Sequence, residues 1–429
     1  MLVERSCVFL LLLWLVGTLA RDPVGYRRKV SLEYNPGLNI SSVNLLHIRA
    51  VGNNDTIHYV WSTIGAPTAL LVYTRSQNST LHVNWTKLFS PAPSGAVHVE
   101  PTDSVLYSTA VIFSKVFEYN GANTSDLFKV PADQFYPTYN LANFTWESLG
   151  DKMNKTTLTA TFRGAASGPE GTFGNGSISF QNSGEKLMQY GAGTSEKAPC
   201  GKDSSQNMVT AYEENSRDAR LPRLLHTANC SKVNFVMSGV APRGNHSRFA
   251  LEIVTVEERE GRKQLESIRS IDDEYTPTIF EMAQLVSVPR NHSTTSSFLQ
   301  WKTTAYSSQH AERADTIHCQ YYPLQTTNCT VPRSSIAHAY FGEDLESHHA
   351  IAAINISFGS EDGEAYEEKR YLSWSALIGF GEPPKDTFST LVIAILAVGL
   401  GTPVVLLVGG SIAAFVSRKK RYSEYEPIN

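Results

Sequence analysis

Alternating apolar and polar positions recur along the chain between residues 44 and 358. In Leu81-His-Val-Asn-Trp-Thr86 the apolar residues occupy every second position, which is the pattern of a strand with one buried face. Turns rich in Gly, Asn, Pro and Ser separate such runs. The predicted strands are Asn44–Val51, Thr56–Ile64, Ala69–Tyr73, Leu81–Phe89, Val105–Tyr119, Leu158–Phe162, Ile178–Phe180, Val233–Val240, Phe249–Val256, Phe298–Tyr306, Ile336–Phe341 and Ile351–Phe358.

The length and spacing of these strands predict a mainly β fold built as an antiparallel sandwich. Residues 183–221 are polar and contain few large apolar side chains, which predicts a loop or linker between two sets of strands. Our interpretation is two β-rich halves, residues 21–182 and 222–386. One continuous sandwich with an inserted loop is the alternative.

An uncharged apolar stretch, Leu391–Val416, predicts a transmembrane helix within residues 387–417. A helix of this length would extend roughly 39 Å, enough for a hydrocarbon core of about 30 Å with some tilt. A basic cluster after a span acts as a stop-transfer signal and holds that end in the cytosol. The cluster consists of Arg418, Lys419, Lys420 and Arg421.

The N-terminal 20 residues predict a secretory signal peptide. Arg5 precedes the apolar run Cys7–Val16, and Thr18, Leu19 and Ala20 follow it where a signal peptidase cleaves. The mature protein is therefore expected to be single-pass type I, with its N-terminus in the lumen and residues 418–429 as a cytosolic tail. The formal net charge of -4 gives no indication of a nucleic-acid partner.

Four cysteines remain after the signal peptide: Cys200, Cys230, Cys319 and Cys329. An even number in an oxidising compartment predicts two disulfides, with three possible pairings. Loop length weakly favours Cys200–Cys230 and Cys319–Cys329. A zinc site is the alternative, but the chain has no C-x-x-C pair.

N-glycosylation sequons are far more frequent than chance predicts. Thirteen of the twenty-three asparagines begin one, whereas chance would give roughly four. The alternating patterns around Asn84 and Asn355 predict that both side chains face solvent. The predicted acceptors are Asn39, Asn54, Asn78, Asn84, Asn123, Asn143, Asn154, Asn175, Asn229, Asn245, Asn291, Asn328 and Asn355.

Catalytic signatures are weak in this chain. It contains no G-x-S-x-G elbow, H-E-x-x-H pair or P-loop, and no motif indicates a cofactor. Asp272-Asp273-Glu274 could bind Ca²⁺ or supply an acid, and His348-His349 could bind a metal, but solvated roles are favoured for both. Gly171–Gly176 lacks the lysine of a phosphate loop and favours a turn. We therefore predict no enzyme, with a membrane-anchored hydrolase as the alternative.

The tail carries Tyr425-Glu-Pro-Ile428, a tyrosine followed at the third position by a bulky apolar residue. Clathrin adaptors bind such segments in extended form, and Pro427 favours an extended residue before it. Tyr425 and Ile428 thus predict sorting to lysosomes. A sorting receptor for a lumenal ligand is a further alternative. Within the span, Ala397 and Gly401 are four residues apart, a spacing that lets another membrane helix approach closely; plain lipid-facing anchoring is the alternative.

The whole chain resembles the glycosylated lysosomal membrane protein family. The stretches that carry the resemblance are Asn44-Leu-Leu-His-Ile-Arg-Ala-Val-Gly52, Pro222-Arg-Leu-Leu-His-Thr-Ala228, Pro242-Arg-Gly-Asn245, Ser270-Ile-Asp-Asp-Glu-Tyr275, Tyr371-Leu-Ser-Trp-Ser375 and Tyr422-Ser-Glu-Tyr425. Cys230 and Cys319 can be placed in the family pattern, whereas Cys200 and Cys329 cannot be placed in it, so the pairing stays open. Glu426-Pro427 departs from the family's tail.

The resemblance implies a type I lysosomal protein that acts as accessory subunit of a major-facilitator transporter. That transporter exports dipeptides, and the accessory subunit protects it from lysosomal proteases. The expected partners are therefore this transporter, the membrane and a clathrin adaptor, and a homodimer is compatible with such a role.

Overall fold

The computed structural model describes fourteen stretches of the chain, and all structural statements below concern them. These stretches are residues 27–38, 42–120, 126–149, 153–155, 158–166, 176–181, 210–218, 220–258, 261–271, 279–289, 295–326, 330–359, 364–385 and 390–423. They form a compact β unit, Tyr26–Ser270 with Phe280–Lys385, and a separate unit that contains the C-terminal helix.

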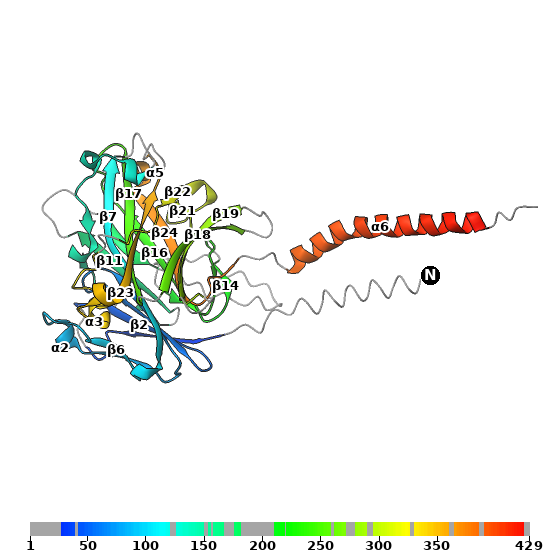
Figure 1. Ribbon diagram of the computed structural model, residues 1–429. Helices are drawn as coiled ribbons and strands as arrows, with labels where there is room; N and C mark the ends of the chain where they lie inside the picture. Colours follow the sequence, from blue (N-terminus) through cyan, green and yellow to red (C-terminus); the bar gives the residue numbers. More distant parts are fainter. Residues whose placement is uncertain are drawn as a thin grey trace, which may run out of the picture. The chain divides into compact units, whose positions relative to one another are not determined.

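The first sheet is antiparallel, and its long central strands β7 and β17 lie side by side (Figure 1). Strand β22 ends the sheet, and the short β8 (Tyr139–Asn140) pairs with the second half of β7. In spatial order the sheet contains β1 (Lys29–Tyr34), β2 (Leu45–Val51), β3 (Thr56–Ser62), β4 (Thr68–Thr74), β7 (Val105–Asn120), β17 (Ser247–Glu258), β23 (His349–Phe358) and β22 (Thr316–Tyr321).

The second sheet is also antiparallel and is centred on β16 and β24. Shorter strands extend it: β10 (Met153–Asn154) pairs with β11, β13 (Thr210–Ala211) with β16, and β21 (Thr304–Tyr306) with β24. Because β22 pairs with both β21 and β23, it joins the two sheets along one edge. In spatial order the sheet contains β9 (Phe144–Trp146), β11 (Thr159–Ala166), β12 (Ser177–Gln181), β16 (Cys230–Ser238), β24 (Tyr371–Phe380), β20 (Ser297–Lys302) and β19 (Ile279–Pro289).

The main hydrophobic core lies between the two sheets. Phe113 of the first sheet contacts Phe180 of the second, with ring centroids 4.6 Å apart. Phe235 stacks on Phe358 across the same interface, and Trp374 is fully buried. Aromatic pairs of this kind add to the burial of apolar surface, so the two sheets form one sandwich.

The outer face of the first sheet is covered as well. A second apolar cluster there includes Val60, Leu70 and Ile112 from the sheet and Trp85 and Ile336 from the elements above it. As a result, every residue of β3 is buried. The covering elements are β5 (Thr80–Val83), β6 (Val97–Glu100), α2 (Trp85–Leu88), α3 (Ile336–Phe341) and α4 (Leu345–His348).

Smaller elements complete the β unit. Strand β18 (Gly261–Ile271) follows β17 after two residues, and the hairpin of β14 (Ser216–Arg217) and β15 (Leu225–His226) precedes β16. The remaining helices are α5 (Glu364–Lys369) and the 3-10 turns η1 (Thr102–Ser104), η2 (Leu127–Lys129), η3 (Ala132–Gln134), η4 (Leu141–Asn143) and η6 (Arg313–Asp315).

The structure confirms the mainly β, antiparallel sandwich and corrects its division into two halves. Strand β7 of the predicted first half pairs with β17 of the second, and β12 pairs with β16. The hydrophobic core is therefore shared, and the strands form one compact unit. The alternative of a single sandwich is the better description.

Two predicted strands are wrong in whole or in part. Ile336–Phe341 is helix α3, which begins after Ser335 and ends at Gly342 with a φ of +96°. Ser before and Gly after a short segment are helix-boundary residues, and they outweigh its apolar content. Leu81–Phe89 is a strand only to Val83, because Asn84 caps helix α2 by accepting a hydrogen bond from the Lys87 backbone.

Helix α6 (Thr390–Ser423) contains the predicted membrane span. Its segment Gly401–Arg418 is long and apolar enough to cross a bilayer, and none of it is buried against protein. Pro403 lies inside the helix, and the basic residues Arg418–Arg421 continue it. The signal peptide lies outside the described residues.

Candidate functional sites

Six predicted glycan acceptors are exposed on the β unit. They lie in turns or at element ends, where a large sugar does not displace core side chains. Asn84 is exposed and Trp85 beside it is buried, as the sequence predicted, although the segment is a capped helix rather than a strand. The exposed acceptors are Asn54, Asn78, Asn84, Asn143, Asn154 and Asn245; Asn39, Asn123, Asn175, Asn291 and Asn328 lie outside the described residues.

The predicted exposure of Asn355 is wrong. Its side chain is 5% exposed, because β23 is flanked by other chain segments and both faces of its sheet are covered. The Tyr322 backbone N–H donates to the Asn355 carbonyl, and Gln325 pairs with Ala353 next to it. Alternation identified the two faces of this strand, but neither face reaches solvent.

We therefore expect the sequon at Asn355 to carry no glycan. A sugar on its amide would have to occupy the interior of the sandwich. Asn355→Gln should leave the intact mass of the mature glycoprotein unchanged apart from the substitution. The matched variant Asn78→Gln, in an exposed turn, should lose one glycan. Loss of one glycan mass in Asn355→Gln would contradict this assignment.

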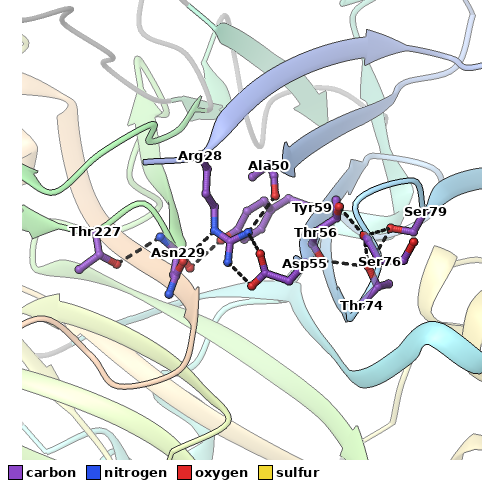
Figure 2. A network of polar contacts seen from close by, with 10 residues as sticks. All are labelled: Arg28, Ala50, Asp55, Thr56, Tyr59, Thr74, Ser76, Ser79, Thr227 and Asn229. Carbon is purple, nitrogen blue, oxygen red and sulfur yellow. Dashed lines mark hydrogen bonds and ion pairs between the residues drawn. The ribbon is translucent and has the colours of Figure 1, made fainter. Parts of the chain in front are cut away.

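Asn229 belongs to a buried polar network around Arg28 (Figure 2). The Arg28 guanidinium donates two parallel hydrogen bonds to the Asp55 carboxylate, both 2.8 Å, and its Nε donates to Asn229 Oδ1 at 2.8 Å. Tyr59 donates its hydroxyl proton to the Asn229 carbonyl at 2.7 Å. Arg28 is 1% exposed, so one cation ties the first sheet to the start of β16 in the second.

A second buried carboxylate anchors the turn that presents Asn245. Glu118 of β7 is fully buried and accepts hydrogen bonds from Tyr139 at 2.9 Å and Ser247 at 2.8 Å. Arg243 forms an ion pair with it at 2.9 Å. Burial raises the pKa of Tyr139 to about 12, so its hydroxyl stays a donor. Tyr139, Ser247 and Arg243 therefore hold the turn in place through Glu118.

A buried histidine pair lies on the outer face of the first sheet. His47 Nε2 and His58 Nδ1 are 2.9 Å apart, and His58 Nε2 is 2.8 Å from Ser79 Oγ. Burial lowers the pKa of His47 to about 3 and that of His58 to about 2. Although Ser and His are hydrogen-bonded here, Ser79 is fully buried, so no substrate reaches its hydroxyl.

The predicted disulfides are not found at the two described cysteines. Cys230 and Cys319 are free thiols, at most 1% exposed, and burial raises the pKa of both. Cys230 instead donates its thiol proton to the Thr227 carbonyl, and Cys319 packs into the main core. Cys200 and Cys329 lie outside the described residues.

The remaining chemical candidates do not assemble into a site. Asp272–Glu274, Gly171–Asn175 and the tail with Tyr425 and Ile428 lie outside the described residues. His348 is exposed and His349 half-buried at the start of β23. Among the described residues, no group of three or more His, Cys, Asp or Glu side chains is arranged to hold a metal ion.

One cavity lies among Ser247, Arg248, Phe358 and Tyr366, and its volume is about 10 Å³. This is about the space that one water molecule occupies. It is too small for a peptide, sugar or ester substrate.

Comparison with known proteins identifies the family. The sequence model of the family described as "Glycosylated lysosomal membrane protein" matches residues 44–193 and 182–421. The chain is 52% identical to glycosylated lysosomal membrane protein A of Xenopus laevis over 429 residues, 99% of both chains. It is 39% identical to the Homo sapiens protein over 406 residues, which is 94% of this chain and 91% of that one. The chain belongs to the glycosylated lysosomal membrane protein family. It is thus a single-pass lysosomal membrane glycoprotein.

Two of the stretches that carry the resemblance, those with Asn44 and Trp374, contribute to the interior of the β unit. Asn44, 2% exposed, donates to Thr63 and to the Glu147 carbonyl and accepts from the Leu149 backbone. Trp374 packs against Trp301 with ring centroids 6.1 Å apart. These contacts give the stretches a role in holding the sandwich together.

Proposed function

We propose that this protein is an accessory subunit that stabilises a lysosomal major-facilitator transporter of dipeptides and protects it from proteolysis. The observation that carries the proposal is the division of the chain into one apolar helix and a compact β unit with six exposed sequons. The β unit would cover lumenal loops of the transporter in a type I orientation. Helix α6 would pack against its membrane helices, with small residues such as Gly401 and Gly409 allowing close approach.

The protective effect follows from mass action. Proteases cleave locally opened states, and a bound partner lowers their population. Glycans on the exposed turns add a steric barrier. Because Arg28 and Glu118 fix the strands and turns that carry Asn54 and Asn245, these two glycans would hold defined positions on the β unit.

A catalytic role finds no support among the described residues. The buried histidine pair and the Glu118 cluster are enclosed, and the cavity beside Arg248 holds about one water. We therefore propose that the protein is not an enzyme. A hydrolase centred on Asp272–Glu274 is the alternative that a screen of glycosides, peptides and esters at acid pH tests.

Delivery to lysosomes would depend on the tail. Tyr425 and Ile428 would bind a clathrin adaptor, with Arg418–Arg421 holding the tail in the cytosol. If the protein were instead a receptor for a soluble lumenal ligand, Tyr425→Ala would misroute receptor and ligand together. A transporter with its own signal would be misrouted less.

Deleting this protein from cells should shorten the half-life of the partner transporter several-fold. Lysosomal protease inhibitors should restore the half-life, since the proposed effect is protection rather than synthesis. Pulse–chase labelling of the transporter measures both, and re-expression of the full chain is the control. An unchanged transporter half-life after deletion would contradict the proposal.

A further inference from the structure

A buried acid–base pair lies where β17 leads into β18. Glu257 Oε2 is 3.7 Å from Lys263 Nζ, and the two side chains are 1% and 11% exposed. Tyr107 of β7 donates to Glu257 Oε2 at 3.2 Å and lies 2.7 Å from Ser297 Oγ of β20. The Glu257 carboxyl on β17 thus contacts β7 and β18, and Tyr107 extends the network to β20.

This cluster is incompletely satisfied in its charged form. Glu257 Oε1 is buried and has no hydrogen-bond partner among the described residues. Other carboxylates here are paired better: the buried Glu118 has four donors, and the partly buried Asp55 has a bidentate arginine. A buried carboxylate with one free oxygen and a distant ammonium is costly, and protonation relieves that cost.

The charged groups around the pair are few. Burial is the main cause that raises the pKa of Glu257, and Lys263 and Tyr107 act against it. Burial also lowers the pKa of Lys263, with Glu257 as the opposing charge. Burial raises the pKa of Tyr107, which stays a neutral hydroxyl. Among the described residues these are the titratable groups that act on Glu257 from β7 and β18, while β19 and β20 contribute the hydroxyls of Ser287 and Ser297.

The cluster also adjoins the end of the β unit from which the chain continues towards α6. The Tyr107 ring lies 6.1 Å from that of Phe380, the last residue of β24, and Phe380 stacks on Tyr73 at 3.7 Å. The following segment is held in place, because Gln300 donates to the Pro384 carbonyl at 3.1 Å. Tyr107 therefore contacts both Glu257 and Phe380, the last residue of β24.

We propose that Glu257, Lys263 and Tyr107 form an acid-stabilised latch that closes β18 onto the sandwich when Glu257 takes up a proton. The protonated Oε2 then donates to the Tyr107 hydroxyl, and Tyr107 donates to Ser297 Oγ. The only covalent change is one O–H bond formed on Glu257, with the proton taken from solvent. Leu265 and Ile268 of β18 pack against two hydrophobic clusters and provide the surface that closure buries.

The direction of the pH effect follows from the linkage between proton binding and closure. A carboxyl group with a higher pKa in the closed form than in the open form favours closure as the pH falls. The latch would therefore be tighter in an acidic lysosome than in the neutral compartments through which the protein is made. This inference concerns the β unit itself and does not depend on the transporter role.

Hydrogen–deuterium exchange of β18 in the full-length glycoprotein tests the latch, with rates corrected for the intrinsic effect of pH. Between pH 7.2 and 5.0 the protection of β18 amides should rise, by up to about tenfold for each unit by which the pKa of Glu257 in the closed form exceeds 5.0. Glu257→Gln keeps the shape without the charge and should be protected equally at both pH values. Lys263→Met leaves the Glu257 carboxylate without its cation, so β18 protection should depend more steeply on pH than in the wild type.

Glu252→Gln is the matched control, because Glu252 lies on the same strand and also pairs with a lysine, Lys115, at 3.2 Å. It should keep the wild-type pH dependence. Wild-type protection that is equal or lower at pH 5.0 would overturn the latch. A Glu257→Gln variant whose β18 protection still rises between pH 7.2 and 5.0 as in the wild type would also overturn it. If Glu257→Gln fails to fold, the Lys263→Met variant decides alone. The proposal is contradicted if β18 protection in Lys263→Met depends on pH as it does in the wild type.

Discussion

Arg28→Met is expected to destabilise the β unit by about 3–5 kcal/mol, the largest single-residue effect that we predict. Removing one partner of a buried ion pair leaves the other charge uncompensated. Here Asp55 would lose two hydrogen bonds and Asn229 one, and the link between the sheets would be lost. Thermal unfolding followed by circular dichroism should show a Tm lower by roughly 6–10 °C.

Arg27→Met is the matched control for this variant. Arg27 is the preceding residue and also pairs with a carboxylate, Glu213, at 3.0 Å, but its side chain is 65% exposed. Exposed ion pairs contribute little to stability, about 0–1 kcal/mol. A similar Tm for the two variants would show that the Arg28 network does not hold the sheets together.

The His47–His58 pair should make the β unit less stable in acid. Both pKa values are lowered by burial, to about 3 and about 2, whereas a histidine of the unfolded chain titrates near 6.5. The stability that each neutral histidine contributes is fully present above pH 6.5. It is lost as the pH falls towards the pKa of that histidine in the folded state. At pH 5 the loss is about 2 kcal/mol per histidine, or roughly 2–4 kcal/mol for the coupled pair.

Urea unfolding at pH 7.5 and pH 5.0 measures this loss. In His47→Gln/His58→Gln the acid-dependent part should shrink by roughly 2–4 kcal/mol, whatever the substitutions do to stability at neutral pH. The matched control is His82→Gln/His98→Gln, since these two histidines also stack across a strand pair but are exposed. A double variant of the buried pair that keeps the full wild-type loss would contradict the assignment.

The sequence predicted the class of fold well, because turns and strand periodicity are local. Gly52–Asp55 is a turn between β2 and β3, and Val105–Tyr119 is the long strand β7. Periodicity was less informative where both faces of a strand are buried. β24, at the centre of the second sheet, alternates only from Leu372 to Ala376, because Leu377 and Ile378 are both buried. Asn355 alternates correctly but faces the interior.

The polar networks could not be predicted from spacing. Arg28 and Asn229 are 201 residues apart in the chain, and Tyr107 and Glu257 are 150 apart. No local pattern marks such partners, since the topology of two sheets brings them together. The division into two halves failed for the same reason. A polar stretch between two sets of strands has the same composition whether it links two domains or connects two strands of one sandwich.

Native purification from lysosomal membranes in mild detergent tests the central claim most directly. The measurement is the identity and stoichiometry of the proteins that co-purify with the full-length chain. The accessory-subunit account predicts a multispan major-facilitator transporter in near-equimolar amount. Recovery of this protein alone, or only as a homodimer, under conditions that preserve other lysosomal membrane complexes would contradict it.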